Sequence, residues 1–150
     1  MIRLLPVYHA NIGKRIVKSP KFYIRDNGIL SSLLSIRSFN ELMSHPVFGE
    51  SWEGLVIENI LSELDDWDGY YYRTSKGAEI DLILEKGQKK IAVECKASSA
   101  PSVSKGFYIS LEDLKIEEAY IIAPVKDEYP IKENVWVMTL KGFIDKMKQK

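Results

Sequence analysis

The sequence is poor in the residues that build disulfides and zinc sites. Its 150 residues include one cysteine, Cys95, and two histidines, His9 and His45. A single cysteine excludes an internal disulfide and any zinc site built from several cysteines. Two histidines exclude a three-histidine metal site. We therefore expect a protein of a reducing, cytoplasmic compartment.

Long apolar segments are also missing. No run approaches the roughly 18–20 apolar residues that a membrane-spanning helix needs, and the first residues lack the features of a secretory signal. The chain has no Gly-x4-Gly-Lys-Ser/Thr motif, so we expect no ATP binding by the P-loop route. With 45% hydrophobic and 28% charged residues, the composition is that of one globular domain without a membrane partner.

Positively charged residues are absent from residues 41–70, although the net charge of the whole chain is zero. Residues 41–70 carry eight acids and no Lys or Arg, whereas residues 1–40 carry seven Lys or Arg and one acid, Asp26. The basic stretch could face a phosphate backbone or an acidic partner. Pairing with the acidic middle of the chain is the simpler alternative, and the charge counts favour it.

The hydrophobic pattern predicts a mixed α/β fold in two parts. Residues 1–25 form an extended N-terminal segment, and residues 26–150 form the domain proper, which starts with a helix capped by Asp26. A long helix is expected at residues 48–64, with an apolar stripe of Trp52, Leu55, Val56, Ile60 and Leu64.

The rest of the chain reads as strands broken by one helix, followed by a terminal helix. We expect strands at 70–73, 79–85, 90–97, 119–123 and 135–138. A loop covers residues 98–106, and a helical stretch lies near 110–115. From residue 48 the order is helix, three strands, helix, strand, which is typical of one mixed α/β domain.

The turn Gly87-Gln88 sets the register of one predicted hairpin. A two-residue turn there places Asp81 opposite Glu94 and Glu79 opposite Lys96. Strand alternation then puts these four polar side chains on one face. This segregation supports the register, because a slip of one residue would mix polar and apolar side chains on both faces. The other face holds the apolar residues Ile80, Leu82, Leu84, Ile91, Val93 and Cys95. We expect Cys95 to be a core residue rather than a nucleophile.

The opposition of Asp81 and Glu94 poses an electrostatic problem. Directly opposed residues hold their Cβ atoms ~4.5–5.5 Å apart, where like charges are destabilising. A shared proton, solvent, Lys96 or a divalent cation could relieve the repulsion. Converging carboxylates are natural ligands of Mg²⁺, and Lys96 on the same face could neutralise charge on a phosphoryl group.

Glu53 is the fourth candidate site residue. Its spacing from Ile57, Ile60 and Leu64 places it on the buried side of the 48–64 helix. Because a buried carboxylate without a partner is costly, we expect this helix to pack over the polar face of the hairpin. Plainer alternatives exist for single residues: Glu79 and Lys96 could form a surface ion pair, and Glu53 could favour the helix start through the helix dipole.

Together these residues resemble a nuclease superfamily. Glu53, the segment Gly77–Ile83 and the segment Ala92–Lys96 are similar to the pattern of the PD-(D/E)XK, or restriction-endonuclease-like, superfamily, except that Ile80 stands where a proline is usual. The resemblance implies an α-β-β-β-α-β core. It also implies that Asp81 and Glu94 hold Mg²⁺ or Mn²⁺, that Lys96 assists catalysis and that Glu53 supports the site.

A narrower resemblance covers nearly the whole chain. It rests on the segments Tyr8–Arg15, Lys18–Gly28, Gly49–Asn59 and Tyr72–Asp81, which are similar to the C-terminal domain of unknown function of bacterial and archaeal AAA-type ATPases. In that family a P-loop ATPase and a winged-helix region come first, so residues 1–25 would correspond to the end of the winged-helix region.

The resemblances imply two functions of different kinds. One is Mg²⁺-dependent hydrolysis of nucleic acid, and the alternative is a non-catalytic module that binds nucleic acid or protein under the control of the ATPase. Convergence of the four side chains on a cation-sized point favours the first. A closed, salt-bridged site favours the second.

Overall fold

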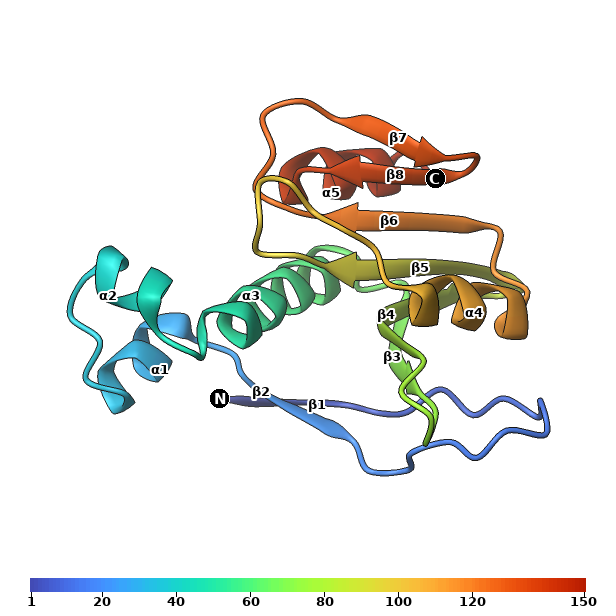
Figure 1. Ribbon diagram of the computed structural model, residues 1–150, viewed down its shortest axis with the longest axis horizontal. Coiled ribbons are helices and arrows are strands. Elements are labelled where there is room, and N and C mark those ends of the chain that lie inside the picture. Colours follow the sequence, from blue (N-terminus) through green and yellow to red (C-terminus); the bar gives the residue numbers. More distant parts are fainter.

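Five helices and two sheets make up the computed structural model, which describes residues 1–150 (Figure 1). The larger sheet has the strand order β3-β4-β5-β6-β8-β7, with bounds β3 Asp68–Arg73, β4 Glu79–Lys86, β5 Lys89–Cys95, β6 Glu118–Ile122, β7 Tyr129–Lys132 and β8 Val135–Met138. β5, β6 and β8 run parallel, and the other neighbours are antiparallel. The predicted mixed α/β fold is confirmed.

Helices cover both faces of this sheet. α3 (Phe48–Glu63) and α5 (Leu140–Lys148) pack on one face, and α4 (Lys105–Leu114) packs on the other. On the α3 side, Val56 and Ile60 are fully buried in one cluster with Leu82 and Val93. Each such side chain contributes about 1.5–3 kcal/mol by leaving water, so α3 is held firmly against the sheet.

An N-terminal arm, residues 2–24, lies beside the edge strand β3 (Figure 1). Its ends pair as the antiparallel strands β1 (Ile2–Leu5) and β2 (Lys21–Ile24). Between them the chain follows β3, where Val17 N–H donates to the Arg73 carbonyl at 2.9 Å. The arm therefore covers a sheet edge that would otherwise expose unpaired backbone groups.

Two short helices connect the arm to α3. They are α1 (Asn27–Leu33) and α2 (Phe39–Ser44), and neither contains a buried residue. Asp26 caps α1 as predicted, because its carboxylate accepts from the backbone N–H groups of Gly28 and Ile29.

Three details of the predicted elements were wrong. α4 begins at Lys105, inside the segment predicted to be a loop, because the Ser104 hydroxyl caps it by accepting from Phe107 N–H at 3.2 Å. β7 was not predicted. Leu55, assigned to the apolar stripe of α3, is 37% exposed, because the buried side of the helix is centred on Val56 and Ile60.

The hairpin β4–β5 has the predicted register. Gly87 adopts a positive φ of 62° in the turn, and the ladder runs from the pair Lys86–Lys89 to the pair Leu82–Val93. It ends one pair short of Asp81 and Glu94, so these two residues lie at the open end of the hairpin rather than within the ladder.

The predicted division of the hairpin into a polar and an apolar face was wrong. Tyr70 pairs with Ile83 but Tyr72 pairs with Ile80, so β4 contains one extra residue at this bulge. The bulge turns Ile80 to the α4 side, where Ile83 is also buried, while Leu82 faces α3. Both faces are therefore apolar along most of the hairpin, and Glu79, Asp81 and Glu94 lie at its open end.

Candidate functional site

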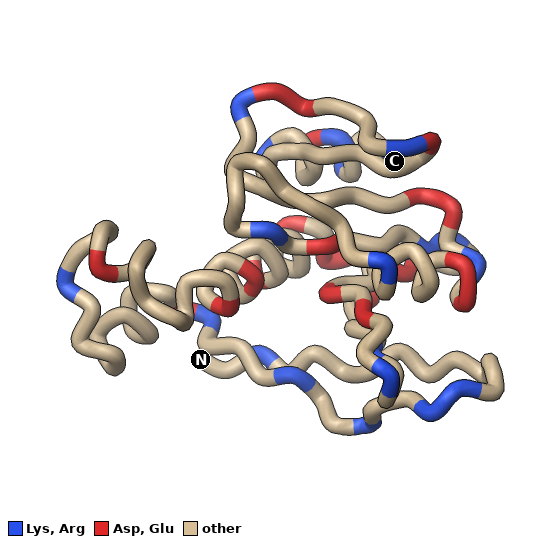
Figure 2. The backbone as a smooth tube through the Cα atoms, in the orientation of Figure 1, with Lys and Arg blue, Asp and Glu red and all other residues tan.

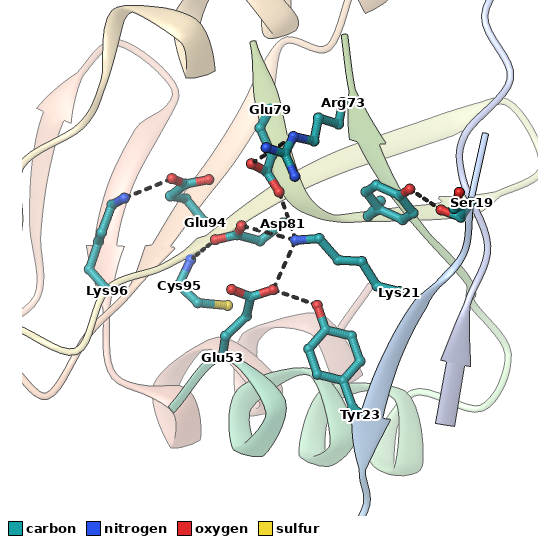
Figure 3. A network of polar contacts seen from close by, with 11 residues as sticks. Ser19, Lys21, Tyr23, Glu53, Arg73, Glu79, Asp81, Glu94, Cys95 and Lys96 are labelled. Atoms are coloured by element: carbon teal, nitrogen blue, oxygen red, sulfur yellow. Dashed lines mark hydrogen bonds and ion pairs between the residues drawn. The ribbon is translucent and has the colours of Figure 1, made fainter. Parts of the chain in front are cut away.

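Four carboxylates meet at the open end of the hairpin and form what we call the acid cluster: Glu53, Glu79, Asp81 and Glu94 (Figure 3). Asp81 and Glu94 are buried, with 8% and 6% of their surface exposed. The backbone N–H of Cys95 donates to Asp81 Oδ2 at 2.8 Å, which ties the two strands together where the ladder stops.

The structure brings together all four site residues predicted from the sequence. Glu53 reaches the cluster from α3, Asp81 from β4 and Glu94 from β5, and the Nζ atom of Lys96 lies 2.8 Å from Glu94 Oε1. The predicted pairing of Glu79 with Lys96 was wrong. Lys96 pairs with Glu94, because the hairpin ladder ends before it reaches Glu79.

Lys21 is the residue that sequence reasoning missed. Its Nζ atom lies 3.1 Å from Glu53 Oε1, 2.7 Å from Glu79 Oε1 and 4.0 Å from Asp81 Oδ1. Two residues further along β2, the Tyr23 hydroxyl donates to the same oxygen of Glu53. Burial disfavours the charged form of Lys21, but Glu53, Glu79 and Asp81 outweigh burial and raise the pKa of its ammonium group.

The opposite charges of residues 1–40 and 41–70 were the signal that could have found this contact. Arg3 and Arg25 both bind Glu58 on α3, and Lys21 binds Glu53 on the same helix. The preferred interpretation, that the basic stretch pairs with the acidic middle of the chain, is confirmed for these three residues. Lys14 instead pairs with Asp113.

The acid cluster holds four carboxyl groups and three basic side chains, Lys21, Lys96 and Arg73. Burial, with Glu94 and Glu53 close by, raises the pKa of Asp81 well above its usual range. Burial also raises the pKa of Glu94, although Lys96 opposes the shift. One carboxylate oxygen, Glu94 Oε2, is buried without a hydrogen-bond partner. Such an oxygen is costly, so a cation at this point would be stabilised.

The side chains of Asp81 and Glu94 have the chemistry that a hard divalent cation requires. They offer carboxylate oxygens, the ligands that Mg²⁺ and Mn²⁺ favour, and one of those oxygens has no other partner. In the arrangement with Lys21 inside the cluster, no three acidic, histidine or cysteine side chains surround one point closely enough to hold a metal.

A cavity of about 460 Å³ adjoins the acid cluster. Its lining includes Lys21, Glu53, Arg73 and Glu79 but neither Asp81 nor Glu94. The Nε atom of Arg73 lies 3.9 Å from Glu79 Oε2 at the rim. The two most buried acids therefore lie behind Lys21 and its partners as seen from the cavity.

A basic groove runs along the N-terminal arm, where the tube in Figure 2 carries Lys and Arg and no acid. Its volume is about 950 Å³, and its lining includes His9, Lys14, Arg15, Lys18 and Ser75. Ser75 N–H donates to the Arg15 carbonyl at 2.9 Å, which holds the groove against the β3–β4 turn that leads to Glu79.

Fold and site together define an α/β protein with a buried acid cluster at one end of a mixed sheet. Residues 48–143 match the family model described as Domain of unknown function (DUF4143), and the chain belongs to this family. Residues 1–40 match a second model, Domain of unknown function (DUF8612). The second model ends at residue 40, inside α2, and the first model begins at residue 48, where α3 starts.

Two curated relatives are similar over most of the chain. They are uncharacterized proteins of Mycobacterium bovis and Mycobacterium tuberculosis, each 38% identical over 135 residues. The matched region is 90% of this chain but 31% of each relative, so the chain spans about a third of their length. No solved structure matches. None of the helices has the length and apolar character needed to cross a membrane.

Proposed function

We propose that this domain is a PD-(D/E)XK-type nuclease module that hydrolyses phosphodiester bonds of nucleic acid with Mg²⁺ or Mn²⁺. The observation that carries the proposal is the burial of Asp81 beside Glu94 with one Glu94 oxygen left unpartnered. Two adjacent buried carboxylates destabilise a fold unless a proton or a cation neutralises one of them, and a divalent cation can bind both. Strongly perturbed carboxyl groups of this kind gather at functional sites.

The order of elements supports the same superfamily. α3, β3, β4, β5, α4 and β6 follow one another along the chain, which is the order of the α-β-β-β-α-β core. Asp81 lies on the second strand of that core, and Glu94 and Lys96 lie at the end of the third.

Each side chain has a role that follows from its surroundings. Asp81 and Glu94 would hold the cation, which when bound polarises the phosphate and promotes attack by water. Lys96 serves as a fixed positive charge near the phosphoryl group. Although burial opposes its charge, the ion pair with Glu94 raises the pKa of Lys96, so it remains protonated and is a poor general base. Glu53 positions Lys21 and Tyr23.

The basic groove supports a nucleic acid as substrate. Arg15 and Lys18 have no acid partner within 4.0 Å among the ion pairs of the chain, so their charges are available to phosphates. The arm joins this groove directly to Lys21, so a phosphate backbone in the groove would lead toward the acid cluster.

A second candidate function is a non-catalytic module that binds nucleic acid or protein. The observation that favours it is the set of ion pairs that close the cluster, with Lys21 on Glu53 and Glu79, and Lys96 on Glu94. In that case no divalent cation would bind, and the acids would serve only to anchor the arm.

An AAA-type ATPase region is the partner that we propose for this domain. The curated relatives are about three times as long as the matched region, and the first 40 residues expose apolar side chains, among them Leu4 at 56% and Phe22 at 68%. Exposed apolar patches mark contact surfaces. Leu4→Ser with Phe22→Ser should weaken co-purification with the ATPase region of a longer relative, and unchanged co-purification would contradict this assignment.

A nuclease assay tests the main proposal. With Mn²⁺, the wild-type chain should cleave DNA or RNA, and Lys96→Met should lower turnover at least about 100-fold while leaving Mn²⁺ binding nearly unchanged. Lys126→Met, at an exposed lysine outside the site, is the matched control and should retain activity. Absence of cleavage of every substrate, together with absence of Mn²⁺ binding, would leave the binding module as the better function.

A further inference from the structure

Lys21 places a positive charge inside the acid cluster, next to the proposed metal ligand Asp81. Its ammonium group reaches Glu53 on α3 and Glu79 and Asp81 on β4, all within 4.0 Å, so one positive charge bridges α3 and β4 beside the proposed metal ligand Asp81 (Figure 3). A lysine ammonium is a compact point charge on a flexible stem. It can neutralise carboxylates as an ion does, and it can also move away.

The carboxyl groups of the cluster are stabilised by its basic side chains. The four carboxylates face three basic groups, of which Lys96 is engaged by Glu94 and Arg73 lies at the rim with 52% of its side chain exposed. Lys21, with 23% of its side chain exposed, is the main neutralising charge for Glu53, Glu79 and Asp81. If Lys21 leaves, these acids repel one another until another cation replaces it or one of them takes up a proton.

The structure also contains a space into which the Lys21 side chain can move. It lines the cavity of about 460 Å³, whereas Asp81 and Glu94 do not. A rotation of its side chain into that cavity would open the way to the two buried acids without detaching β2 from β1. The strand itself is fixed by the backbone pairing of Lys21 with Leu5, which is 1% exposed.

We infer that Lys21 is a tethered cation that closes the acid cluster, and that a divalent cation binds by displacing its ammonium group into the adjoining cavity. This inference rests on the proposed function, because it assumes that Asp81 and Glu94 hold the metal. It makes the N-terminal arm a regulator of metal loading. When most molecules hold Lys21 in the cluster, the apparent metal affinity falls to the intrinsic affinity multiplied by the fraction of molecules that are open.

Calorimetric titration with Mn²⁺ tests the exchange. Lys21→Met keeps most of the side-chain length and removes the charge, so it should bind Mn²⁺ at least about tenfold more tightly than the wild type, which corresponds to a closed fraction of about 90% or more. Lys21→Arg keeps a cation and should not gain affinity. Lys18→Met removes an exposed charge from the same arm and should match the wild type.

The outcomes separate this inference from the proposed function. Equal affinities of the wild type and Lys21→Met, with binding lost in Asp81→Asn, would overturn the exchange but keep the metal site. Absence of Mn²⁺ binding in every variant would overturn both.

The wild type offers a test that does not depend on the folding of a variant. During a Mg²⁺ titration, the side-chain NMR signals of Lys21 should shift in step with binding, and those of Lys18 should not. Metal binding without any shift of Lys21 would overturn the exchange.

Discussion

Helix α3 carries two glutamates that the N-terminal arm contacts, and they experience opposite surroundings. Glu58 is bound by Arg3 at 2.5 Å and by Arg25 at 2.8 Å. The hydrogen bond from Arg3, against the effect of burial and with help from Arg25, lowers the pKa of Glu58 to about 2. Glu53, one and a half turns earlier, shares Lys21 with Glu79 and Asp81.

This difference in surroundings means that the charge of Glu58 stabilises the folded chain, whereas the charges of the buried acids in the cluster destabilise it. At Glu58 two cations serve one carboxylate, so its ionised form is favoured in the folded chain. In the acid cluster the pKa values of Asp81 and Glu94 are raised, first by burial, so the folded chain disfavours their charges. Charges that cost stability are expected where a function needs them.

The largest difference between Glu58 and the acid cluster should appear in the binding of divalent ions. Asp81→Asn and Glu94→Gln should each weaken Mn²⁺ binding at least about 100-fold, because each removes a charged oxygen ligand. Glu58→Gln, on the same helix as Glu53, should leave binding unchanged because the partners of Glu58 are arginines. Calorimetric titration measures all three. Binding that survives in Asp81→Asn would show that the ion lies elsewhere.

Stability without divalent ions should change in opposite directions at the two places. Glu58→Gln should destabilise the chain by about 1–2 kcal/mol, because two charge-assisted hydrogen bonds weaken. Asp81→Asn should stabilise it by about 1 kcal/mol, because a buried like charge is removed while an oxygen still accepts from Cys95 N–H. Urea unfolding measures both. A loss of stability in both variants would remove the contrast.

Acid titration should sharpen the comparison further. Because the pKa of Glu58 is lower in the folded than in the unfolded chain, its stabilising effect is complete above about pH 4.5 and is lost as the pH falls toward about 2. The stability difference between the wild type and Glu58→Gln should therefore shrink over this window. The difference for Asp81→Asn should also shrink on acidification, because wild-type Asp81 takes up a proton at a raised pKa. Urea unfolding at several pH values checks both trends.

The smallest effect is expected for an exposed ion pair. Lys86 lies 2.5 Å from Asp66, but their side chains are 44% and 56% exposed. Solvent screens such a pair, so Asp66→Asn should leave the melting temperature within experimental error. A clear drop would mean that pairing alone, rather than burial, explains the role of Glu58.

Most of the fold could be predicted because its signals are local. The Gly87-Gln88 turn sets the hairpin register, Asp26 marks the start of α1, and the periodicity of apolar residues marks α3. β7 escaped prediction because it is a short edge strand whose four residues are all exposed, so no alternation of buried and exposed residues marks it, and because it contains Pro130. The turn of Ile80 toward α4 depends on a bulge against β3, which hairpin alternation cannot predict.

The candidate site could be predicted in its residues but not in its contacts. The hairpin register and the helix spacing are visible in the sequence, and they identified Glu53, Asp81, Glu94 and Lys96. Lys21 lies 32 residues before Glu53, and its contact depends on how the arm crosses β3. The charge asymmetry between residues 1–40 and 41–70 pointed to such pairing without identifying which lysine meets which acid.

A crystal structure of the wild type soaked in Mn²⁺, with anomalous data collected, tests the central claim most directly. We expect an anomalous peak bonded to oxygens of both Asp81 and Glu94, with the Lys21 ammonium moved into the adjoining cavity. Crystals in which Mn²⁺ is absent from these carboxylates, with Lys21 still among Glu53, Glu79 and Asp81 at saturating metal, would contradict the claim.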